Sequence, residues 1–378
     1  MFHEINNIEL KLVRYFHKMS LQEVADKLNI SRQYLHQFET GQKSAEQYIG
    51  KLADIYEVKP NFFMKKEPII QEEQVHFRKL HRTKDLDKQS IISTSDYIKR
   101  FLEVIEKEGV IFPKIDLPDL SNQNFNINNP SDIERIAEYC RKYWDLGQGA
   151  ISNMTKLCES KGIFVLSYDN HGDNSDIDAL SVALRRPIIV RSSIKKNPCR
   201  LRFDLAHELG HLLLHEGIVT GCRETESQAN HFAGAFLLPR TIMLKYFPKM
   251  ISPTGRFSWN KISEFKMLFK VNKSAILYRA KQLSLITEAQ YRKGVIHLKN
   301  NGEAIQENED KLIEIEIPSL IENCLASLAK HNKIYIENIA NAMDVQLIFL
   351  EKLLSIDVTN PLYSRKAKAL KVDYLKLE

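Results

Sequence analysis

The sequence predicts a multidomain, mainly α-helical protein with one small α+β unit near its middle. Three observations lead to this fold class. Two short, capped, amphipathic helices are indicated at 20–39, and several short strand patterns at 163–191 precede an apolar, proline-free helix. From residue 260 onward, apolar residues again recur with the spacing typical of helices. We therefore expect an all-helical head, an α+β core and a helical C-terminal region.

Composition and charge narrow the class of protein. With 378 residues, 43% hydrophobic and 27% charged, the chain is long enough for two or three domains with sizeable cores. The net charge of +6 permits nucleic-acid binding without requiring it. There is no apolar run of about 20 residues and no signal-peptide core, so no membrane partner is expected. The cysteines are odd in number and never form a C-x-x-C pair, which suits free thiols in the cytoplasm.

The first predicted pair of helices has the form of a helix-turn-helix. Ser20-Leu21-Gln22-Glu23 is a capping box, Asn29-Ile30 is a turn, Ser31 caps a second helix, and Gly41 ends it. The second helix of such a pair can enter the DNA major groove. Arginine prefers guanine and glutamine prefers adenine among base edges. The residues expected to contact DNA are Gln22, Arg32, Gln33 and Gln37.

This region resembles the XRE (lambda-repressor-like) helix-turn-helix family. The matching stretches are Leu21-Gln22-Glu23-Val24-Ala25, Leu28-Asn29-Ile30-Ser31 and Phe38-Glu39-Thr40-Gly41. The resemblance implies a five-helix DNA-binding domain over 8–66 that reads a double-stranded operator. Because the local charge is only weakly positive, specific affinity is expected to need a homodimer on paired half-sites. A helical protein-interaction domain with the same core is the alternative.

Residues 67–130 are interpreted as a connector with added helices. The stretch 65–88 is basic and is expected to be a solvated linker, with phosphate contact as the alternative. Helical spacing follows at 94–108, and the polar stretch 118–130 is expected to be a loop. The basic residues are Lys65, Lys66, Arg78, Lys79, Arg82, Lys84 and Lys88.

The α+β unit is expected to begin at residue 131. Ser131-Asp132 should cap a helix that ends near Gly147, and a second helix should cover 150–161. Strands are expected at 163–168, 179–184 and 187–191, followed by a helix from about Leu201 to Glu216. The edge strand of such a sheet can hold an extended peptide through main-chain hydrogen bonds.

The last of these helices carries His207-Glu208-Leu209-Gly210-His211. Residues four apart share a helix face, so both imidazoles can point at one ion. Zinc accepts imidazole nitrogen and, in catalytic sites, keeps one position for water. Glu208, beside the first histidine, is placed to take a proton from that water. The alternative is a coincidental pair of histidines on a buried helix.

The third ligand should come from the helix that starts near Glu224. Chemistry alone leaves Glu224, Glu226 and His231 open. Asn230 is placed to orient a ligand side chain through a hydrogen bond. His215, two turns after His207, has rotated by about 40° per four-residue step, so it is expected to pack against or support the ligands.

Two separated motifs in this region resemble those of the ImmA/IrrE metallopeptidase family in order and spacing. They are His-Glu-Leu-Gly-His at 207–211 and Glu-x-x-Ala-Asn-x-Phe-Ala-x-x-Phe-Leu-Leu-Pro at 226–239. The resemblance spans 131–290 and implies a zincin-like, gluzincin-type zinc endopeptidase. It implies a Zn²⁺ site of His207, His211 and Glu226, with Glu208 as the general base. One position departs from the family pattern: Asp204 stands where a threonine is common. His231, Tyr278 or an arginine would be the group that stabilises the oxyanion.

Two later segments repeat the apolar spacing of the first helix pair. A shift of 241 carries Leu28, Ile30 and Leu35 onto Phe269, Val271 and Ile276, within an expected helix pair at 260–287. A shift of 315 carries them onto Met343, Val345 and Leu350. We expect both repeats to dock substrate or partner protein, with DNA binding as the alternative. Residues 314–378 are interpreted as a C-terminal helical module.

Together these features predict an intracellular transcriptional regulator with a DNA-binding head and a zinc-dependent endopeptidase body. Its protein substrate would be a repressor, a partner or the chain itself. The alternative is a non-proteolytic transcription factor, or an antitoxin-like repressor, whose metallopeptidase-like domain senses a ligand, metal or partner.

Overall fold

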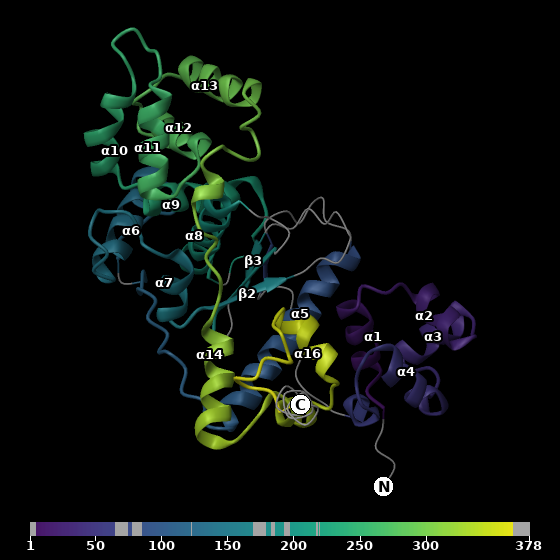
Figure 1. Cartoon of the computed structure of the whole chain (residues 1–378). Coiled ribbons are helices and arrows are strands. Elements are labelled where there is room, and N and C mark those ends of the chain that lie inside the picture. The colour runs from purple at the N-terminus through teal and green to yellow at the C-terminus, as the bar shows by residue number, and fades with distance from the viewer. Residues whose placement is uncertain are drawn as a thin grey trace, which may run out of the picture.

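The computed structural model describes residues 5–64, 75–77, 85–121, 123–168, 179–182, 186–192, 197–216, 218 and 220–365. Figure 1 shows three regions: a purple head on one side, a teal and green body on the other, and yellow C-terminal helices beside the long helix α5 between them. The predicted fold class, mainly helical with a small sheet, is confirmed. No helix among the described residues is both long enough and apolar enough to cross a membrane.

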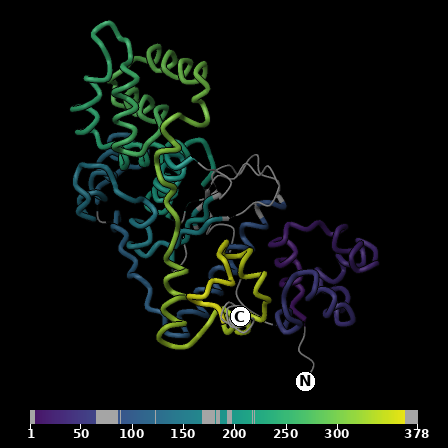
Figure 2. The backbone as a smooth tube through the Cα atoms, in the orientation of Figure 1, coloured from purple at the N-terminus to yellow at the C-terminus, as the bar shows by residue number. Residues whose placement is uncertain are grey.

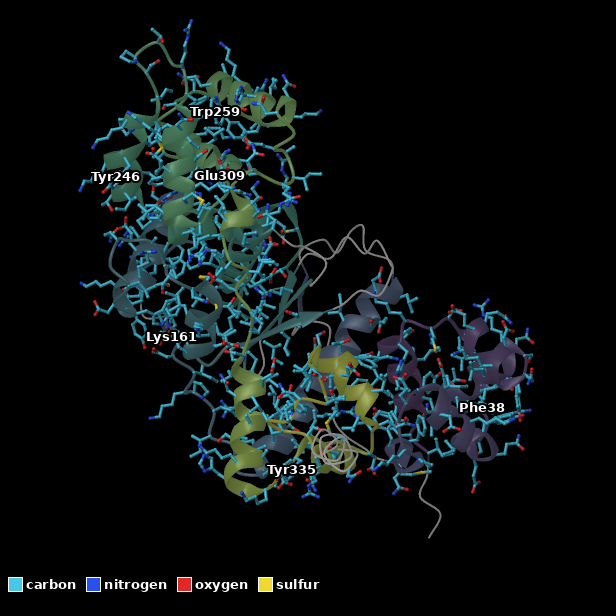
Figure 3. The ribbon with its side chains drawn as sticks, viewed as in Figure 1. Phe38, Lys161, Tyr246, Trp259, Glu309 and Tyr335 are labelled. Carbon is cyan, nitrogen blue, oxygen red and sulfur yellow. The ribbon has the colours of Figure 1, made fainter. Side chains whose placement is uncertain are left out.

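The head has the predicted helix-turn-helix at its centre. Ser20 and Glu23 form the expected capping box, Ser31 caps the second helix, and Asn29 between them is left-handed with φ 55°. The four helices bury an apolar stripe each against one another, and Phe38 lies inside the head (Figure 3). Its elements are α1 (Asn7–Phe16), α2 (Leu21–Leu28), α3 (Arg32–Glu39), η1 (Glu46–Tyr48), α4 (Ile49–Ile55) and η2 (Pro60–Met64).

The connector differs from the expected solvated linker. Residues 75–77 form strand β1 (Val75–Phe77), and α5 (Asp85–Lys107) begins well before the expected 94. Three residues are too few to show a strand pattern in a sequence, so β1 had no signal of its own. The basic residues Lys65, Lys66, Arg78, Lys79, Arg82 and Lys84 lie outside the described residues.

A mixed sheet of four strands lies in the order β1-β3-β4-β2. β2 and β4 are parallel, whereas β3 is antiparallel to both β4 and β1. Along β2 and β4, alternate side chains enter two different apolar cores, so these strands read as continuous apolar runs. The last three strands match the predicted ones with shifted ends: β2 (Phe164–Tyr168), β3 (Ala179–Val182) and β4 (Ile188–Ser192).

Of the helices of the body, α7 and α8 pack against this sheet, and α9 packs on α8. Two expected helix starts were wrong: Asn129, and not Ser131, caps α6, and α8, capped by Asn197, begins at Pro198, three residues before the expected Leu201. In both cases a proline follows the cap, where its missing N–H costs nothing. The bounds are α6 (Pro130–Tyr143), α7 (Met154–Ser160), α8 (Pro198–Leu214), α9 (Arg223–Leu237), α10 (Arg240–Tyr246), η4 (Phe247–Met250), α11 (Trp259–Phe269), α12 (Lys273–Gln282) and α13 (Glu288–Asn300).

A long segment, 301–319, links the body to the C-terminal helices, as the tube in Figure 2 shows. Its carboxylates are held by buried lysines: Lys273 Nζ lies 2.9 Å from Glu309 Oε1, and Lys266 Nζ lies 2.6 Å from Asp310 Oδ1. Glu309 lies beside α11 and α12 (Figure 3). Farther along, Glu316 pairs with Arg202 of α8. The segment is therefore fastened to the body along its length.

The two repeats of the helix-turn-helix spacing are confirmed as helix pairs. Lys270 and Asp344 are left-handed at the positions equivalent to Asn29. The last pair docks onto the head: Lys59 N–H donates to Asp344 O at 2.8 Å, and Gln346 N–H donates to Glu57 O at 2.9 Å. The C-terminal elements are η5 (Asp310–Leu312), α14 (Leu320–Ser327), η6 (Leu328–Asn332), α15 (Ile336–Met343) and α16 (Leu347–Leu354).

Candidate metal centre

Helix α8 carries His207 and His211 on one face, and both side chains are buried. Gly210 lets α9 come close to this face. A Cβ at that position would lie 3.1 Å from Phe232 Cδ1 and 3.4 Å from Ala229 Cα. The close approach of the two helices brings Glu226, in the first turn of α9, to the two histidines.

Three ligand atoms converge at this point. His207 Nε2 lies 3.0 Å from His211 Nε2 and 3.5 Å from Glu226 Oε2. His211 Nε2 lies 3.3 Å from Glu226 Oε1. Of the other candidates for third ligand, Glu224 is exposed, and His231 contacts Glu134 instead. The structure therefore brings together the three residues that the resemblance implied.

Hydrogen bonds behind the histidines orient both rings. Asn230 Oδ1 accepts from His207 Nδ1 at 3.0 Å, which leaves the Nε2 lone pair of His207 facing Glu226. His215 Nε2 donates to Gln228 Oε1 at 2.8 Å, so its Nδ1 accepts from His211 Nδ1 at 2.9 Å. We assign these tautomers from the hydrogen-bond network. His215 thus supports a ligand, as one of its two predicted roles required.

The donor set fits zinc. Two imidazole nitrogens and one carboxylate are the protein ligands of a catalytic zinc site that keeps a position for substrate or water. Burial acts to raise the pKa of Glu226, but hydrogen bonds and charge from His207 and His211 outweigh it and lower that pKa to about 2. Burial also lowers the pKa of His215 to about 4, so its ring is neutral at pH 7. Glu226 is thus in the form that coordinates a metal, and the neutral His215 ring can accept from His211.

Glu208 is fully buried beside the candidate ligands and is hydrogen-bonded to the sheet. Ser181 Oγ on β3 donates to Glu208 Oε2 at 2.9 Å, and Ser181 is itself fully buried. Sequence reasoning missed Ser181, because a serine in a strand carries no signal that it contacts a buried carboxylate. The contact places the carboxylate between α8 and β3.

Comparison with known families agrees with this geometry. The family described as IrrE N-terminal-like domain matches residues 158–281, and the helix-turn-helix family matches residues 17–63. The chain carries a helix-turn-helix domain followed by an IrrE N-terminal-like domain. No curated protein matches the chain. The resemblances stated for the two regions are confirmed in this order.

Two candidates for stabilising an oxyanion in the IrrE N-terminal-like domain are engaged elsewhere. His231 Nε2 lies 2.7 Å from Glu134 Oε1, and Arg279 Nη2 donates to Glu134 Oε2 at 2.6 Å. Burial acts to raise the pKa of Glu134, but its hydrogen bonds to Arg279 and His231 lower it to about 2. Tyr278, the third candidate, lines a pocket of about 270 Å³ that Asn230 also lines.

Three of the four predicted DNA-contacting residues of the helix-turn-helix domain are exposed. Arg32 and Gln33 are exposed in the first turn of α3, and Gln37 is half-buried one turn later. Gln22 is also exposed, and its Nε2 donates to Asp26 Oδ1 at 2.7 Å. The repeats lack such a surface: Lys273 is buried among carboxylates, and α16 has Leu347 where α3 has Arg32.

Proposed function

We propose that the chain is a DNA-binding transcriptional regulator whose IrrE N-terminal-like domain is a zinc-dependent endopeptidase. The observation that carries the proposal is the convergence of His207, His211 and Glu226, with the outer nitrogen of each imidazole already hydrogen-bonded. Such outer contacts preset the ligand tautomers before a metal arrives. The proposed domain bounds are 8–66 for the head, 131–290 for the peptidase and 314–378 for the C-terminal module.

The residues of the site have separate tasks in peptide hydrolysis. Zinc held by His207, His211 and Glu226 would supply the Lewis acidity that polarises the scissile carbonyl. Glu208 accepts a proton from the attacking water and returns it to the leaving amine. Ser181 keeps the Glu208 carboxylate oriented while it does so. The low pKa of Glu226 keeps that ligand ionised throughout the neutral range.

The proposed substrate is a protein: a repressor, a partner, or the chain itself. The head supports a regulatory role because its reader helix would place the peptidase at an operator. A homodimer bound to paired half-sites is the form we propose on DNA. Cleavage of a repressor there would switch gene expression.

One observation favours a second candidate, a transcription factor in which the peptidase-like domain senses a ligand, metal or partner without cleaving it. Strand β1 of the connector lies along the edge of β3 beside Glu208. A domain whose peptide-binding edge is permanently filled would keep the metal ligands but not turn over. An antitoxin-like repressor is a variant of this candidate.

The variant Glu208→Gln separates the two candidates. It removes the proton acceptor and leaves the three metal ligands, so we expect one zinc per chain, unchanged operator binding and loss of cleavage. The measurements are zinc stoichiometry, DNA binding, and cleavage of candidate repressors followed by mass spectrometry. If the wild type and Glu208→Gln are equally inactive while zinc and DNA binding persist, the sensor function is correct.

A further inference from the structure

Strand β1 occupies the outer edge of β3, and β3 is the strand next to Glu208. The pairing is antiparallel, with Val75 opposite Val182, His76 opposite Ser181 and Phe77 opposite Leu180. The order of the sheet is β1-β3-β4-β2, so β1 covers the edge of β3 that β4 leaves free. The connector between the head and α5 thus supplies the outermost strand of the sheet at this point.

The register places β1 at the reactive part of the site. His76 is opposite Ser181, and Ser181 Oγ donates to the Glu208 carboxylate. The other edge strand, β2, is separated from β3 by β4 and therefore lies about 10 Å away, at about 4.8 Å per strand. Of the two sheet edges, the one covered by β1 is the one near the ligands.

Only one chain can pair with a given sheet edge, because each main-chain N–H and C=O there forms a single set of ladder bonds. An extended peptide that binds a sheet edge uses the same bonds. A peptide substrate and β1 therefore exclude each other on β3.

We infer that the free edge of β3 is the peptide-binding surface of the metal centre and that Val75–Phe77 is an internal strand that competes for it. This inference rests on the proposed peptidase function. An incoming protein segment binds antiparallel to β3 and displaces β1. β1 pairs with three of the four residues of β3, so a segment displaces it only by supplying the same main-chain hydrogen bonds together with further contacts at the metal centre.

The position of β1 in the chain links this edge to the head. η2 ends the head at Met64, and α5 begins at Asp85 and packs against α1, so both sides of the connector lead to the head and its neighbours. The peptide that opens the site is expected to be extended and free of proline at the paired positions.

The test uses proline variants of the full-length, zinc-loaded chain in the Glu208→Gln background, so that binding is measured without cleavage. Successive N–H groups of a strand point to opposite edges. Val75 and His76 are adjacent, so the N–H of one of them faces β3 and the N–H of the other faces away. Proline at the first position removes a hydrogen bond to β3, and proline at the second removes none and is the matched control. The probe is a fluorescent peptide with the sequence of residues 71–82, and its control carries proline at both positions.

We expect the proline variant that loses a hydrogen bond to β3 to show faster amide exchange at residues 179–182. It should also bind the probe about 10- to 100-fold more tightly than the control proline variant does. Equal affinity of both variants and the parent overturns the inference, as does an equal gain in both. If a proline variant does not fold, the triple replacement Val75→Gly, His76→Gly and Phe77→Gly must give the same gain. Cleavage of the active wild-type chain within 71–82 would also overturn it, because β1 would then be a substrate.

The amide-exchange and affinity readouts are independent of turnover. The proposed function fails when no cleavage depends on Glu208, whereas the inference fails when peptide affinity does not depend on β1.

Discussion

At the scale of single residues, the orientation of the two histidines depends on side chains that are not metal ligands themselves. Asn230 accepts from His207 Nδ1, and a chain of hydrogen bonds runs from His211 through His215 and Gln228 to Asn128 Oδ1, the last at 3.0 Å. These contacts fix the ring orientation at both histidines, which lowers the entropy lost when zinc binds. Loss of one of these hydrogen bonds should weaken zinc binding without removing a ligand.

The replacement Asn230→Leu is expected to weaken zinc affinity by about 10- to 100-fold. Leucine cannot accept from His207 Nδ1, so the ring can rotate and change tautomer. The matched control is Asn230→Asp, which keeps an acceptor at the same place and should stay near the wild type. Zinc dissociation constants from chelator competition measure both. Wild-type affinity in Asn230→Leu would contradict the role given to this contact.

Ser181 acts on Glu208 in the same indirect way. Removal of its hydroxyl in Ser181→Ala leaves Glu208 Oε2 without its donor from β3, and we expect kcat to fall about 10-fold with little change in KM. Zinc content should not change, because Ser181 is hydrogen-bonded to Glu208 and not to a ligand. Ser181→Thr restores the hydroxyl and should recover kcat. A drop in zinc content instead of kcat would mean that Ser181 is only structural.

At the scale of elements, three helix pairs share one turn geometry but differ in use. α3 is fastened at its end by a buried ion pair, with Arg14 Nε 2.6 Å and Arg14 Nη2 2.8 Å from the Glu39 carboxylate, so its first turn is presented rigidly. α12 and α16 keep the left-handed turn and the apolar spacing. At the position equivalent to Arg32, α12 has the buried Lys273 and α16 has the apolar Leu347, so neither repeats the exposed guanidinium of α3.

Because the first turn of α3 is exposed, we expect a substitution there to weaken DNA binding by a measurable amount. Gln33→Ala should weaken binding to the cognate operator by about 1–3 kcal/mol, the usual worth of one bidentate base contact, and should relax specificity at one base pair. Fluorescence anisotropy with cognate and single-base-changed duplexes measures the effect. Arg292→Ala, at an exposed position on α13, is the control. An unchanged operator affinity would show that α3 does not read bases.

At the scale of the whole molecule, the sheet separates two apolar cores. One core fills the IrrE N-terminal-like domain, and the other runs from the head through α5 to the C-terminal helices. Phe349 of α16 joins these parts, with its ring centroid 4.5 Å from that of Phe16 and 5.4 Å from that of Tyr97. We therefore expect the head and the C-terminal helices to unfold together.

This second core should be sensitive to acid through His17. Burial lowers the pKa of His17 to about 4, although the charge of Glu57 acts to raise it. Its Nε2 donates to Tyr56 O at 2.9 Å, a contact that also acts to raise the pKa but does not outweigh burial. Because the folded pKa lies below the unfolded value of 6.5, the stability is fully present above pH 6.5. It is lost as the pH falls toward 4.

Between pH 7 and pH 5 the unfolding free energy should fall by about 2 kcal/mol from this group. The variant His17→Gln keeps a donor for Tyr56 but does not titrate, so its loss over the same interval should be smaller by that amount. Denaturant unfolding at several pH values gives both curves. Parallel curves for the wild type and His17→Gln would exclude His17 as the titrating group.

Local patterns were enough to predict much of this protein. Capping boxes, short turns and apolar spacing depend on neighbours within about four positions, so the Ser20 cap, the Asn29-Ile30 turn and the two repeats of apolar spacing could be placed from the chain alone. The i,i+4 spacing of His207 and His211 is likewise a property of one helix. Chemistry alone left the third ligand open, and the resemblance to a family selected Glu226.

Contacts between elements that are distant in sequence were decided only by the tertiary structure. Glu226 meets the histidines because Gly210 lets α9 approach α8, and Ser181 meets Glu208 because β3 packs on the same helix. Val75–Phe77 becomes a strand because the edge of β3 offers it hydrogen-bond partners, and nothing in those three residues requires this. Short-range preferences place helices and turns, whereas the packing of whole surfaces selects which side chains meet.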